Sequence, residues 1–537
     1  MMADTLQQLL RDRADQDGIA VKYGDRTWTW REHLAEAAAQ AAALIAAADP
    51  QRPLHVGVLM GNTPDMLTAL AAAGLGGYVL CGINTTRRGD ALARDIKRVD
   101  CQMVLTDPDH RHLLDDVDLE ADLPGVTVVD VSTTAWADRV ASAPALTPHR
   151  EVGGDDTFMM IFTSGTSGEP KAVEVPHAMV LFSGSALVER YGLGDTDVCY
   201  LAMPLFHSNA VYAGWSVALG AGAAMAPAAF SASRFLPDVR RYGATYMNYV
   251  GKPLAYILAT AERPDDAENP LRIAFGNEAN ERDIDEFGRR FACTVWDGFG
   301  STETAVIVTR PDDCPTGSIG KGFPGVAIYD PETVRECEVA RFDEAGALVN
   351  ADAATGELVN TAGSGLFRGY YNDPGATDQR MRHGMYWSGD LAYRDADGWI
   401  YLAGRTADWM RVDGENLTSA PIERILLRLP VISRVAVYPV PDDYVGDQVM
   451  AAIVLRDDAD LGPERFAEFL SVQRDLSPKA WPRLVWIADD LPSTATNKVL
   501  KRELIALGAD ARGRVLWKRD GSTFHVQDVT TSATPAE

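Results

Sequence analysis

A run of glycines and small hydroxyl residues, placed between two apolar stretches, is the part of the sequence best suited to chemistry. It reads F-T-S-G-T-S-G-E-P-K over residues 162–171. Its glycines let the backbone turn sharply and point successive N–H groups at an anion, while the hydroxyls and one lysine add donors and positive charge. A plain polar hairpin loop is the ordinary alternative, but this repeated pattern is too specific for it, and it is not a Walker A sequence. We predict a phosphate-binding loop formed by Thr163, Ser164, Gly165, Thr166, Ser167, Gly168 and Lys171.

This loop resembles the signature loop of the acyl-adenylate-forming enzymes, a group that includes acyl-CoA synthetases, peptide-synthetase adenylation domains and luciferases. Further elements of the family's motif series follow in order up to about residue 502. The segment D-G-F-G-S-T-E at 297–303 resembles the family's Y-G-x-T-E element. The resemblance implies nucleotide contacts for Asp297, Gly298, Phe299, Gly300, Ser301 and Thr302. It implies that Phe299 lies near adenine and that Thr302 meets the phosphates or the acyl carboxylate.

The same resemblance supplies a metal site, the ribose contacts and a catalytic lysine. Glu303, together with Thr166, is expected to hold Mg²⁺. Y-W-S-G-D at 386–390 resembles the element whose aspartate binds the ribose hydroxyls, here Asp390, and Arg405 matches an arginine near the ribose. P-S-T-A-T-N-K at 492–498 resembles the element that supplies the adenylation lysine, here Lys498.

These residue types suit the chemistry that the resemblance implies. A carboxylate that attacks the α-phosphate of ATP is repelled by the triphosphate, so cations must gather at that phosphorus. Glu303, Asp390 or Lys498 taken alone would each be an ordinary polar residue at a turn or helix start. Their ordered appearance favours the catalytic interpretation. Two residues depart from the pattern, Phe299 for tyrosine and Asn497 for glycine, and both are mild changes, because asparagine tolerates left-handed backbone conformations.

Shorter motifs point to one branch of the family. R-V-D-G-E-N-L at 411–417 carries the G-E-N variant of fatty-acid-transport-type and very-long-chain acyl-CoA synthetases. Gly276, Asn277 and Glu278, at the family's adenine-binding loop, resemble the same group and actinobacterial fatty-acid ligases. In M-P-L-F-H-S-N at 203–209 the resemblance places His207 near the acyl carboxylate as a catalytic residue, with a core or capping histidine as the alternative.

The resemblance also implies a C-terminal domain that moves. Asp408 falls where the family has its hinge, and the segment around Gly414 would line a tunnel for the pantetheine arm of coenzyme A. An ordinary turn aspartate is the alternative for Asp408. We therefore expect an ATP- and Mg²⁺-dependent fatty acid–CoA ligase that works through an acyl-AMP intermediate and releases pyrophosphate.

Other activities stay open at this stage. An acyl-AMP ligase that delivers to a carrier protein, a luciferase-like oxygenase and an inactive lipid- or nucleotide-binding homologue are the alternatives. Joint retention of Thr166, Lys171, Glu303, Asp390 and Lys498 argues against the last. The acid itself is open between fatty, sterol side-chain and aryl acids. The oligomeric state is open too, with a homodimer as one arrangement.

Composition agrees with an enzyme of the cytoplasm. The net charge of −26 repels nucleic acid, so no nucleic-acid partner is expected. Six scattered cysteines form no C-x-x-C pair, and no secretory signal opens the sequence, which favours reduced thiols in a cytoplasm. The uncharged stretches 66–83 and 210–230 are rich in Gly and Ala, so we expect in each a buried helix that runs into a buried strand, and no transmembrane span.

The elements that must position these residues predict an α/β fold. Strands at 54–60, 102–106, 126–131, 157–161 and 172–175 and a helix at 64–73 give a βαβα rhythm, typical of doubly wound sheets. Gly-punctuated β segments at 319–402 suggest a small barrel-like subdomain. A helix at 420–429 and a strand at 435–439 open an α+β stretch. We predict an N-terminal adenylate-forming domain at 1–406, a mobile C-terminal domain at 407–520 and a flexible tail at 521–537.

Overall fold

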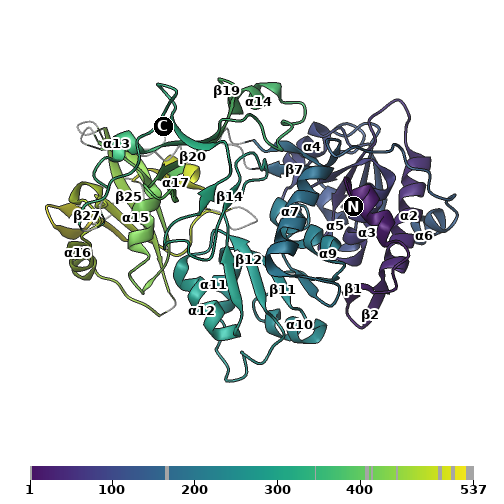
Figure 1. Cartoon of the computed structure of the whole chain (residues 1–537), viewed down its shortest axis with the longest axis horizontal. Coiled ribbons are helices and arrows are strands. Elements are labelled where there is room, and N and C mark those ends of the chain that lie inside the picture. Colours follow the sequence, from purple (N-terminus) through teal and green to yellow (C-terminus); the bar gives the residue numbers. More distant parts are fainter. Residues whose placement is uncertain are drawn as a thin grey trace, which may run out of the picture. The chain divides into compact units, whose positions relative to one another are not determined.

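The computed structural model describes residues 3–163, 169–344, 346, 348–405, 410–412, 415–442, 446–456, 458–493, 499–509 and 515–527. The chain folds into two compact units (Figure 1). Unit 1 comprises Met1–Ala305 and Ser364–Met381, and unit 2 comprises Val306–Gly363 and Arg382–Glu537. The division into domains at residue 406 stays a prediction.

Sheet I of unit 1 is six-stranded, with the order β6-β5-β3-β4-β7-β8. Its neighbours are parallel except β7 and β8, which pair as an antiparallel hairpin. The strands are β3 (His55–Leu59), β4 (Val79–Gly82), β5 (Met103–Thr106), β6 (Thr127–Asp130), β7 (Thr157–Thr163) and β8 (Lys171–Pro176). β3, β4 and β5 are buried along their whole length, as expected of parallel strands covered on both faces.

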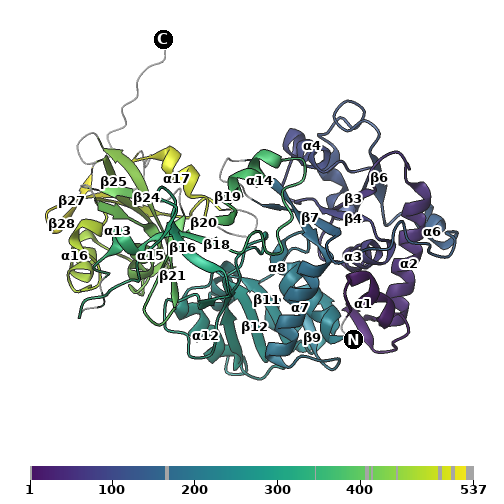
Figure 2. The ribbon, with the colours of Figure 1, turned by 45° about the horizontal axis from the view of Figure 1, so that its top comes forward.

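Sheet II of unit 1 is seven-stranded, with the order β13-β12-β11-β9-β10-β1-β2. Only β1 and β2 pair antiparallel. The strands are β1 (Ile19–Tyr23), β2 (Arg26–Thr29), β9 (Val198–Leu201), β10 (Ala224–Pro227), β11 (Tyr246–Val250), β12 (Ile273–Asn277) and β13 (Thr294–Asp297). Figure 2 shows β9, β11 and β12 running side by side. The two sheets confirm the predicted doubly wound α/β class.

Helices connect these strands, and several begin at residues that stabilise a helix end. The Thr63 side chain accepts from the Met66 N–H at the start of α3, and Pro64 occupies the first turn. Gly77 ends α3 with φ of 68°, where a Cβ atom would lie 2.2 Å from the Arg150 carbonyl oxygen. The helices of unit 1 are α1 (Leu6–Arg13), α2 (Trp30–Ala47), α3 (Pro64–Gly76), α4 (Gly89–Arg98), α5 (Pro108–Arg111), α6 (Thr134–Ala141), α7 (His177–Tyr191), α8 (Ser208–Ala210), α9 (Ser216–Ala221), α10 (Phe235–Tyr242), α11 (Lys252–Leu258), α12 (Glu281–Phe291) and α14 (Pro374–Arg380).

The two uncharged stretches fold as expected. The first becomes α3 followed by β4, and the second becomes α8, α9 and β10. A π-helical turn at Val211–Trp215 joins α8 to α9, a feature that the sequence did not predict. Within the described part of the chain, no helix combines the length and the apolar character needed to cross a membrane.

The segment Ser364–Met381 returns to unit 1 and lies along β8. Tyr370 forms an isolated antiparallel bridge with Val173, and the Tyr371 N–H donates to the Ala172 carbonyl at 2.8 Å. The Glu174 N–H donates to the Gly369 carbonyl at 3.1 Å. This long-range pairing brings Tyr370 next to the strand that begins with Lys171.

Unit 2 contains the Gly-punctuated β segments as an antiparallel sheet with the order β17-β16-β18-β20-β19, and β21 pairs with β20. A separate pair joins β14 and β15. The elements are β14 (Val308–Thr309), β15 (Lys321–Gly322), β16 (Val326–Asp330), β17 (Arg335–Glu336), α13 (Ala351–Ala354), β18 (Gly356–Asn360), β19 (Met381–Arg382), β20 (Met385–Arg394) and β21 (Ile400–Arg405).

The remainder of unit 2 is an α+β arrangement around a mixed sheet with the order β23-β22-β25-β26-β27-β28, and β24 pairs with β25. Its elements are β22 (Met410–Val412), β23 (Glu415–Leu417), α15 (Ser419–Leu426), β24 (Ile432–Asp442), β25 (Gly446–Leu455), α16 (Pro463–Ser471), β26 (Leu484–Ala488), α17 (Lys501–Leu507), β27 (Val515–Asp520) and β28 (Thr523–Gln527). β28 corrects the expected start of the tail at Gly521. This strand pairs with β27, and its Phe524 is buried against Phe466.

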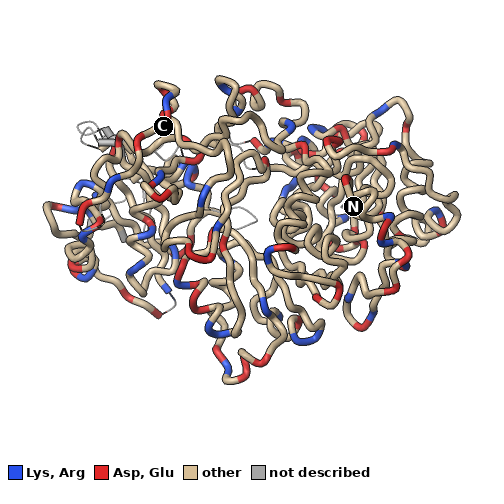
Figure 3. Tube along the Cα trace, in the orientation of Figure 1, with Lys and Arg blue, Asp and Glu red and all other residues tan. Residues whose placement is uncertain are grey.

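Charged side chains are mixed along both units. Figure 3 shows Lys and Arg interspersed with Asp and Glu along the described part of the chain.

Candidate active site

The predicted phosphate loop lies at the carboxyl end of β7. Thr163 is the last residue of β7 and Lys171 the first of β8, and their Cα atoms are register partners in the hairpin. The carboxyl ends of parallel strands are where α/β sheets bind ligands. Ser164, Gly165, Thr166, Ser167 and Gly168 lie outside the described residues.

Lys171 and Glu303 meet at one aromatic side chain. The Lys171 ammonium lies 5.2 Å from the centre of the Tyr370 ring, and the Tyr370 hydroxyl donates to Glu303 Oε1 at 2.7 Å. Lys171, Tyr370 and Glu303 are 8 %, 4 % and 7 % exposed. Burial and the nearby Glu303 carboxylate raise the pKa of Tyr370, which keeps its hydroxyl protonated. Among the described residues neither charge has an ion-pair partner, so both are available to a charged ligand.

Thr302 lies beside the turn that carries His207. Its hydroxyl is 2.9 Å from the Ser208 hydroxyl, and its carbonyl accepts from the Tyr212 hydroxyl at 3.0 Å. Tyr212 belongs to the π-helical turn. Thr302, the predicted phosphate contact, is therefore connected to His207, the predicted contact of the acyl carboxylate, through the adjacent Ser208.

His207 lies immediately before α8 and is half-buried, and its Nε2 atom is buried. Its Nε2 atom has no hydrogen-bond partner among the residues that the structure describes, and the ring lies 4.5 Å from that of Phe206. Burial lowers the pKa of His207 to about 4, so the imidazole is neutral at neutral pH. A neutral imidazole with a free nitrogen can donate one hydrogen bond to an incoming carboxylate.

Three asparagine side chains form a ladder of hydrogen bonds between the segment next to His207 and the predicted adenine loop. Asn248 Nδ2 donates to Asn209 Oδ1 at 2.8 Å, and Asn209 Nδ2 donates to Asn277 Oδ1 at 2.9 Å. Asn277 Nδ2 then donates to the Gly298 carbonyl at 2.7 Å. The ladder connects α8, next to His207, with the predicted adenine loop on β12.

The predicted adenine loop and the segment 297–303 lie at the carboxyl ends of neighbouring parallel strands. Gly276 and Asp297 are register partners of β12 and β13, and the Gly298 N–H donates to the Gly276 carbonyl at 2.8 Å. Asp297 accepts from the Ala279 N–H at 3.0 Å. Glu278 has a left-handed φ of 64°, a strained conformation of the kind that clusters at functional sites. Phe299 and Ser301 are half-buried after β13, and Gly300 is exposed.

The predicted ribose-binding pair lies in unit 2. Asp390 on β20 and Arg405 at the end of β21 are register partners, and Arg405 Nε is 3.3 Å from Asp390 Oδ1. The Asp390 N–H donates to the Ser388 hydroxyl at 3.0 Å, and the preceding Gly389 N–H donates to Glu357 Oε1 at 2.7 Å. These bonds fix the strand at the carboxylate that is expected to receive the ribose hydroxyls.

Lys498, Asp408 and Gly414 lie outside the described residues. Within the described residues, no three His, Cys, Asp or Glu side chains gather into a metal site. A Mg²⁺ ion that arrives with a nucleotide needs only one or two carboxylates, because phosphates and water complete its shell. The buried, singly hydrogen-bonded Glu303 carboxylate fits that requirement.

Sequence reasoning missed Tyr370 and Asn209 as site residues. Tyr370 stands in G-Y-Y-N at 369–372, an aromatic pair after glycine that could have signalled a packed turn. Its partner Glu303 is 67 residues away, and no local spacing indicates that contact. Asn209 closes the quoted motif 203–209, but its three amide partners come from two separate strands.

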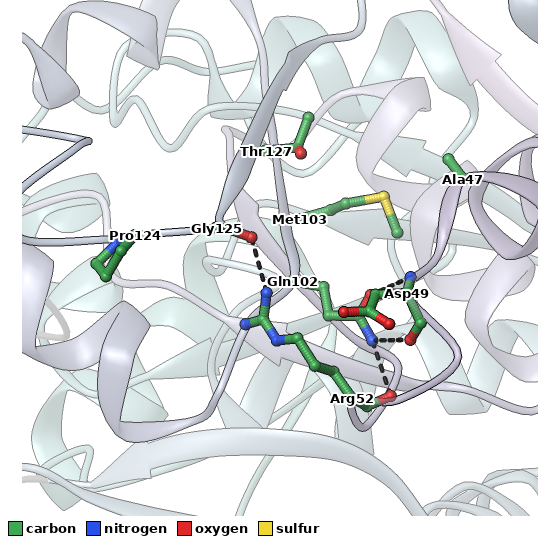
Figure 4. Close-up of a pocket in the computed structure, with 8 residues that line it drawn as sticks. All are labelled: Ala47, Asp49, Arg52, Gln102, Met103, Pro124, Gly125 and Thr127. Atoms are coloured by element: carbon green, nitrogen blue, oxygen red, sulfur yellow. Dashed lines mark hydrogen bonds between the residues drawn. The ribbon is translucent and has the colours of Figure 1, made fainter.

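A cavity of about 490 Å³ lies at the opposite edge of sheet I (Figure 4). Gln102 and Thr127, at the amino ends of β5 and β6, help to line it. The Gln102 amide donates to the carbonyls of Asp49, Arg52 and Pro53 at 2.7–3.2 Å. The Gln102 side chain thus holds the loop before β3 in place, which is a structural role.

Two family models and several known proteins match this chain. The model of the AMP-binding enzyme family matches residues 10–371, and the model of the AMP-binding enzyme C-terminal domain matches residues 421–498. Medium/long-chain-fatty-acid–CoA ligase FadD17 of Mycobacterium marinum is 51 % identical over 525 residues, which cover 97 % of this chain and 100 % of that protein. Steroid-22-oyl-CoA synthetase of Rhodococcus jostii is 44 % identical over 504 residues, 93 % of this chain and 90 % of that protein.

A solved structure supports the fold over nearly the full length. ATP-bound MatB from Rhodopseudomonas palustris matches with a TM-score of 0.81 at 25 % identity, over 95 % of this chain and 99 % of that one. The matched family model covers more than half of the sequence and includes the phosphate loop, His207 and Glu303. This chain therefore belongs to the AMP-binding enzyme family.

Proposed function

We propose that this chain is an ATP-dependent acyl-CoA ligase that activates a fatty acid as acyl-AMP and transfers the acyl group to coenzyme A. The observation that carries the proposal is the 51 % identity to a medium/long-chain fatty-acid–CoA ligase along essentially the whole of both chains. Pyrophosphate leaves in the first step and AMP in the second. The site in unit 1 has the charges and donors that the first step needs.

The residues of unit 1 divide the work between nucleotide and acid. The buried Lys171 ammonium binds phosphate oxygens, and the Thr302 hydroxyl donates to the α-phosphate or to the acyl carboxylate. The neutral His207 imidazole orients that carboxylate without repelling a neighbouring cation. Preorganised donors of this kind stabilise charge that develops in the transition state, each worth about 10²–10³ in rate.

Mg²⁺ is proposed to enter with ATP, held by Glu303 and Thr166. The buried Glu303 carboxylate, with one oxygen hydrogen-bonded to Tyr370, supports that assignment. When bound, the ion neutralises phosphate charge. Lys498 is proposed to add a second cation at the α-phosphate, Asp408 to act as the hinge and Gly414 to line the coenzyme A tunnel. These three assignments rest on the motif resemblance.

The proposal is tested by the acid and acceptor requirements of ATP cleavage. Straight-chain fatty acids should stimulate pyrophosphate release and AMP formation, and amino acids should not. Addition of coenzyme A should convert the product from acyl-AMP to acyl-CoA. A strong response to amino acids with none to any fatty acid would contradict the proposal. Acyl-AMP that reacts only with a carrier protein would favour the acyl-AMP ligase instead.

A steroid side-chain acid is a second candidate substrate. The specific observation in its favour is the 44 % identity to a steroid-22-oyl-CoA synthetase over 93 % of this chain. Paired measurements of kcat/KM with a C12 fatty acid and a steroid-22-oic acid would rank the two substrates. A higher value for the steroid acid would replace the fatty acid in the proposal.

We propose a cytoplasmic location as well. All six cysteines are free, and three of them, Cys81, Cys101 and Cys199, are buried. Free thiols persist in reducing compartments, whereas oxidising compartments favour disulfides. Fractionation of cells that express the tagged chain would test the location, and recovery in a secreted fraction would contradict it.

A further inference from the structure

A tyrosine outside the expected motif series stands between the two buried charges of the candidate site. Tyr370 is 4 % exposed and is held from several sides. Its N–H donates to the Thr377 hydroxyl at 3.0 Å, its ring packs edge-on against Phe367 at 5.1 Å, and its backbone bridges to Val173. A side chain fixed in this way has a set orientation before any ligand arrives.

The ring and the hydroxyl of Tyr370 contact groups of opposite charge. The ring face carries negative quadrupole charge and attracts the Lys171 ammonium, 5.2 Å from its centre. The hydroxyl is a donor and reaches Glu303 Oε1 at 2.7 Å, the length of a charge-assisted bond. Arg380 Nε lies 3.4 Å from the same hydroxyl oxygen and donates to it, which makes the hydroxyl a better donor.

A direct ion pair between Lys171 and Glu303 would make both charges unavailable to a ligand. Opposite charges a few ångströms apart in a buried site attract strongly, and a closed ion pair would have to break before a ligand could bind. No Lys171–Glu303 ion pair forms within 4 Å in the described structure, and the phenol contacts each group separately. Each charge therefore keeps a partner while its remaining hydrogen-bonding capacity stays open.

We infer that Tyr370 is a positioning residue that separates Lys171 from Glu303 and holds the Glu303 carboxylate for the magnesium–nucleotide complex. This inference rests on the proposed function, because it assumes that Glu303 faces the metal and Lys171 the phosphates. The hydroxyl acts on the metal side and the ring on the phosphate side. The two contributions can therefore be separated by substitution.

The test measures nucleotide binding by isothermal titration calorimetry without acid, so that no turnover occurs. Tyr370→Phe removes the hydroxyl and keeps the ring. We expect it to weaken binding of ATP with Mg²⁺ about tenfold, the order of one hydrogen bond to a charged group. Binding of ATP in excess chelator should change less than twofold, since the Lys171–ring contact remains. Tyr370→Leu, which removes the ring too, should weaken ATP in both conditions.

Tyr371→Phe is the matched control. It removes a neighbouring tyrosine hydroxyl, which donates to Asp100 at 2.9 Å at an exposed position. It should leave both dissociation constants unchanged. Each variant should have the helical content of the wild type, and its melting temperature is recorded, so that a loss of binding is not mistaken for unfolding.

A double variant identifies the path of the effect. In a Glu303→Gln background, Tyr370→Phe should cause no further loss of Mg²⁺-dependent ATP binding, because its partner carboxylate is gone. Equal losses in both backgrounds, or wild-type Mg²⁺ dependence in Tyr370→Phe, would overturn the inference. If instead Glu303→Gln alone bound ATP with Mg²⁺ as the wild type does, the assigned role of Glu303 would be overturned. If the wild type bound no ATP, the proposed function would be overturned.

Discussion

Asp390 and Arg405 face each other across two antiparallel strands, β20 and β21, with Arg405 Nε 3.3 Å from Asp390 Oδ1. Asp390 is largely buried, whereas Arg405 is exposed over 40 % of its side chain. The arginine therefore shields one carboxylate oxygen and fixes its direction. This geometry suits a carboxylate that accepts hydrogen bonds from two vicinal hydroxyls.

Asp390→Asn should raise KM for ATP by about tenfold or more, because an amide offers one acceptor oxygen where the carboxylate offers two. The KM for the acid should change little. Steady-state kinetics with each substrate varied in turn checks this expectation. Glu336→Gln is a control in the same sheet, because it removes the carboxylate from the exposed Arg394–Glu336 pair. An unchanged KM for ATP in Asp390→Asn would exclude the ribose role.

Asn209→Ala should raise KM for both ATP and the acid, each by about tenfold. The substitution breaks the ladder from Asn248 to Asn277, and so loosens the predicted adenine loop and the turn at His207 together. Asn269→Ala is the comparison, because Asn269 makes three hydrogen bonds in the same unit away from the site. Both variants should lose stability, but only the first should lose substrate affinity. A selective effect on one substrate would contradict a joint role.

Stability should fall as the pH drops below about 6.5. Burial lowers the pKa values of His33, His177 and His207 to about 4, below the ordinary value of 6.5. The unfolded chain therefore binds more protons between these limits, and each histidine reduces the free energy of unfolding by about 1.4 kcal/mol per pH unit. Their contribution is complete above pH 6.5 and is lost toward pH 4.

Urea unfolding at pH 7.5 and 5.5 measures this dependence. Wild type should show a lower midpoint at pH 5.5, and His33→Gln should show a smaller difference between the two values because it cannot take up a proton. Within that window most carboxyl groups stay ionised, so they affect the comparison little. Identical midpoints for wild type at both pH values would contradict the burial of three neutral imidazoles.

Lys498→Ala should reduce acyl-AMP formation by about 10²–10³. It should largely spare thioester formation from supplied acyl-AMP and coenzyme A, because the lysine is proposed to act only in the adenylating pose. Separate assays of the two half-reactions measure both effects. Arg502→Ala, an exposed cation on the following helix, is the control.

The proposed hinge predicts the opposite pattern for Asp408→Pro. A fixed φ should hinder rotation, so acyl-AMP formation persists while thioester formation collapses. Equal loss of both half-reactions in either variant would point to a folding defect or a wrong assignment.

Local patterns predicted the strands and the loop that they position. Apolar runs placed β3, β5, β6, β7 and β8 within one or two residues, since a buried parallel strand needs an unbroken apolar stretch. The run of glycine and hydroxyl residues falls between β7 and β8 in the sequence, as predicted. The expected start of the tail at 521 came too early, because residues 523–527 pair with β27 as β28 and bury Phe524 against Phe466.

Long-range hydrogen bonds set the rest of the site, and these leave no local trace. Asn209 has partners on β11 and β12, and Tyr212, in the π-helical turn after α8, donates to the Thr302 carbonyl. Tyr370 was outside every predicted motif, although it contacts two predicted site residues. Such contacts depend on how distant segments pack, which residue spacing in one stretch does not encode.

Because Ser364–Met381 belongs to unit 1, a single cut in the gene cannot separate the two units. The polypeptide changes unit at residues 305/306, again at 363/364 and again at 381/382. A fragment that stops at Ala305 encodes every strand of sheets I and II, yet it omits the residue that bonds Glu303. Complementation by two separately expressed pieces therefore requires that one of them carry 364–381, even though this stretch comes after 58 residues of the other unit.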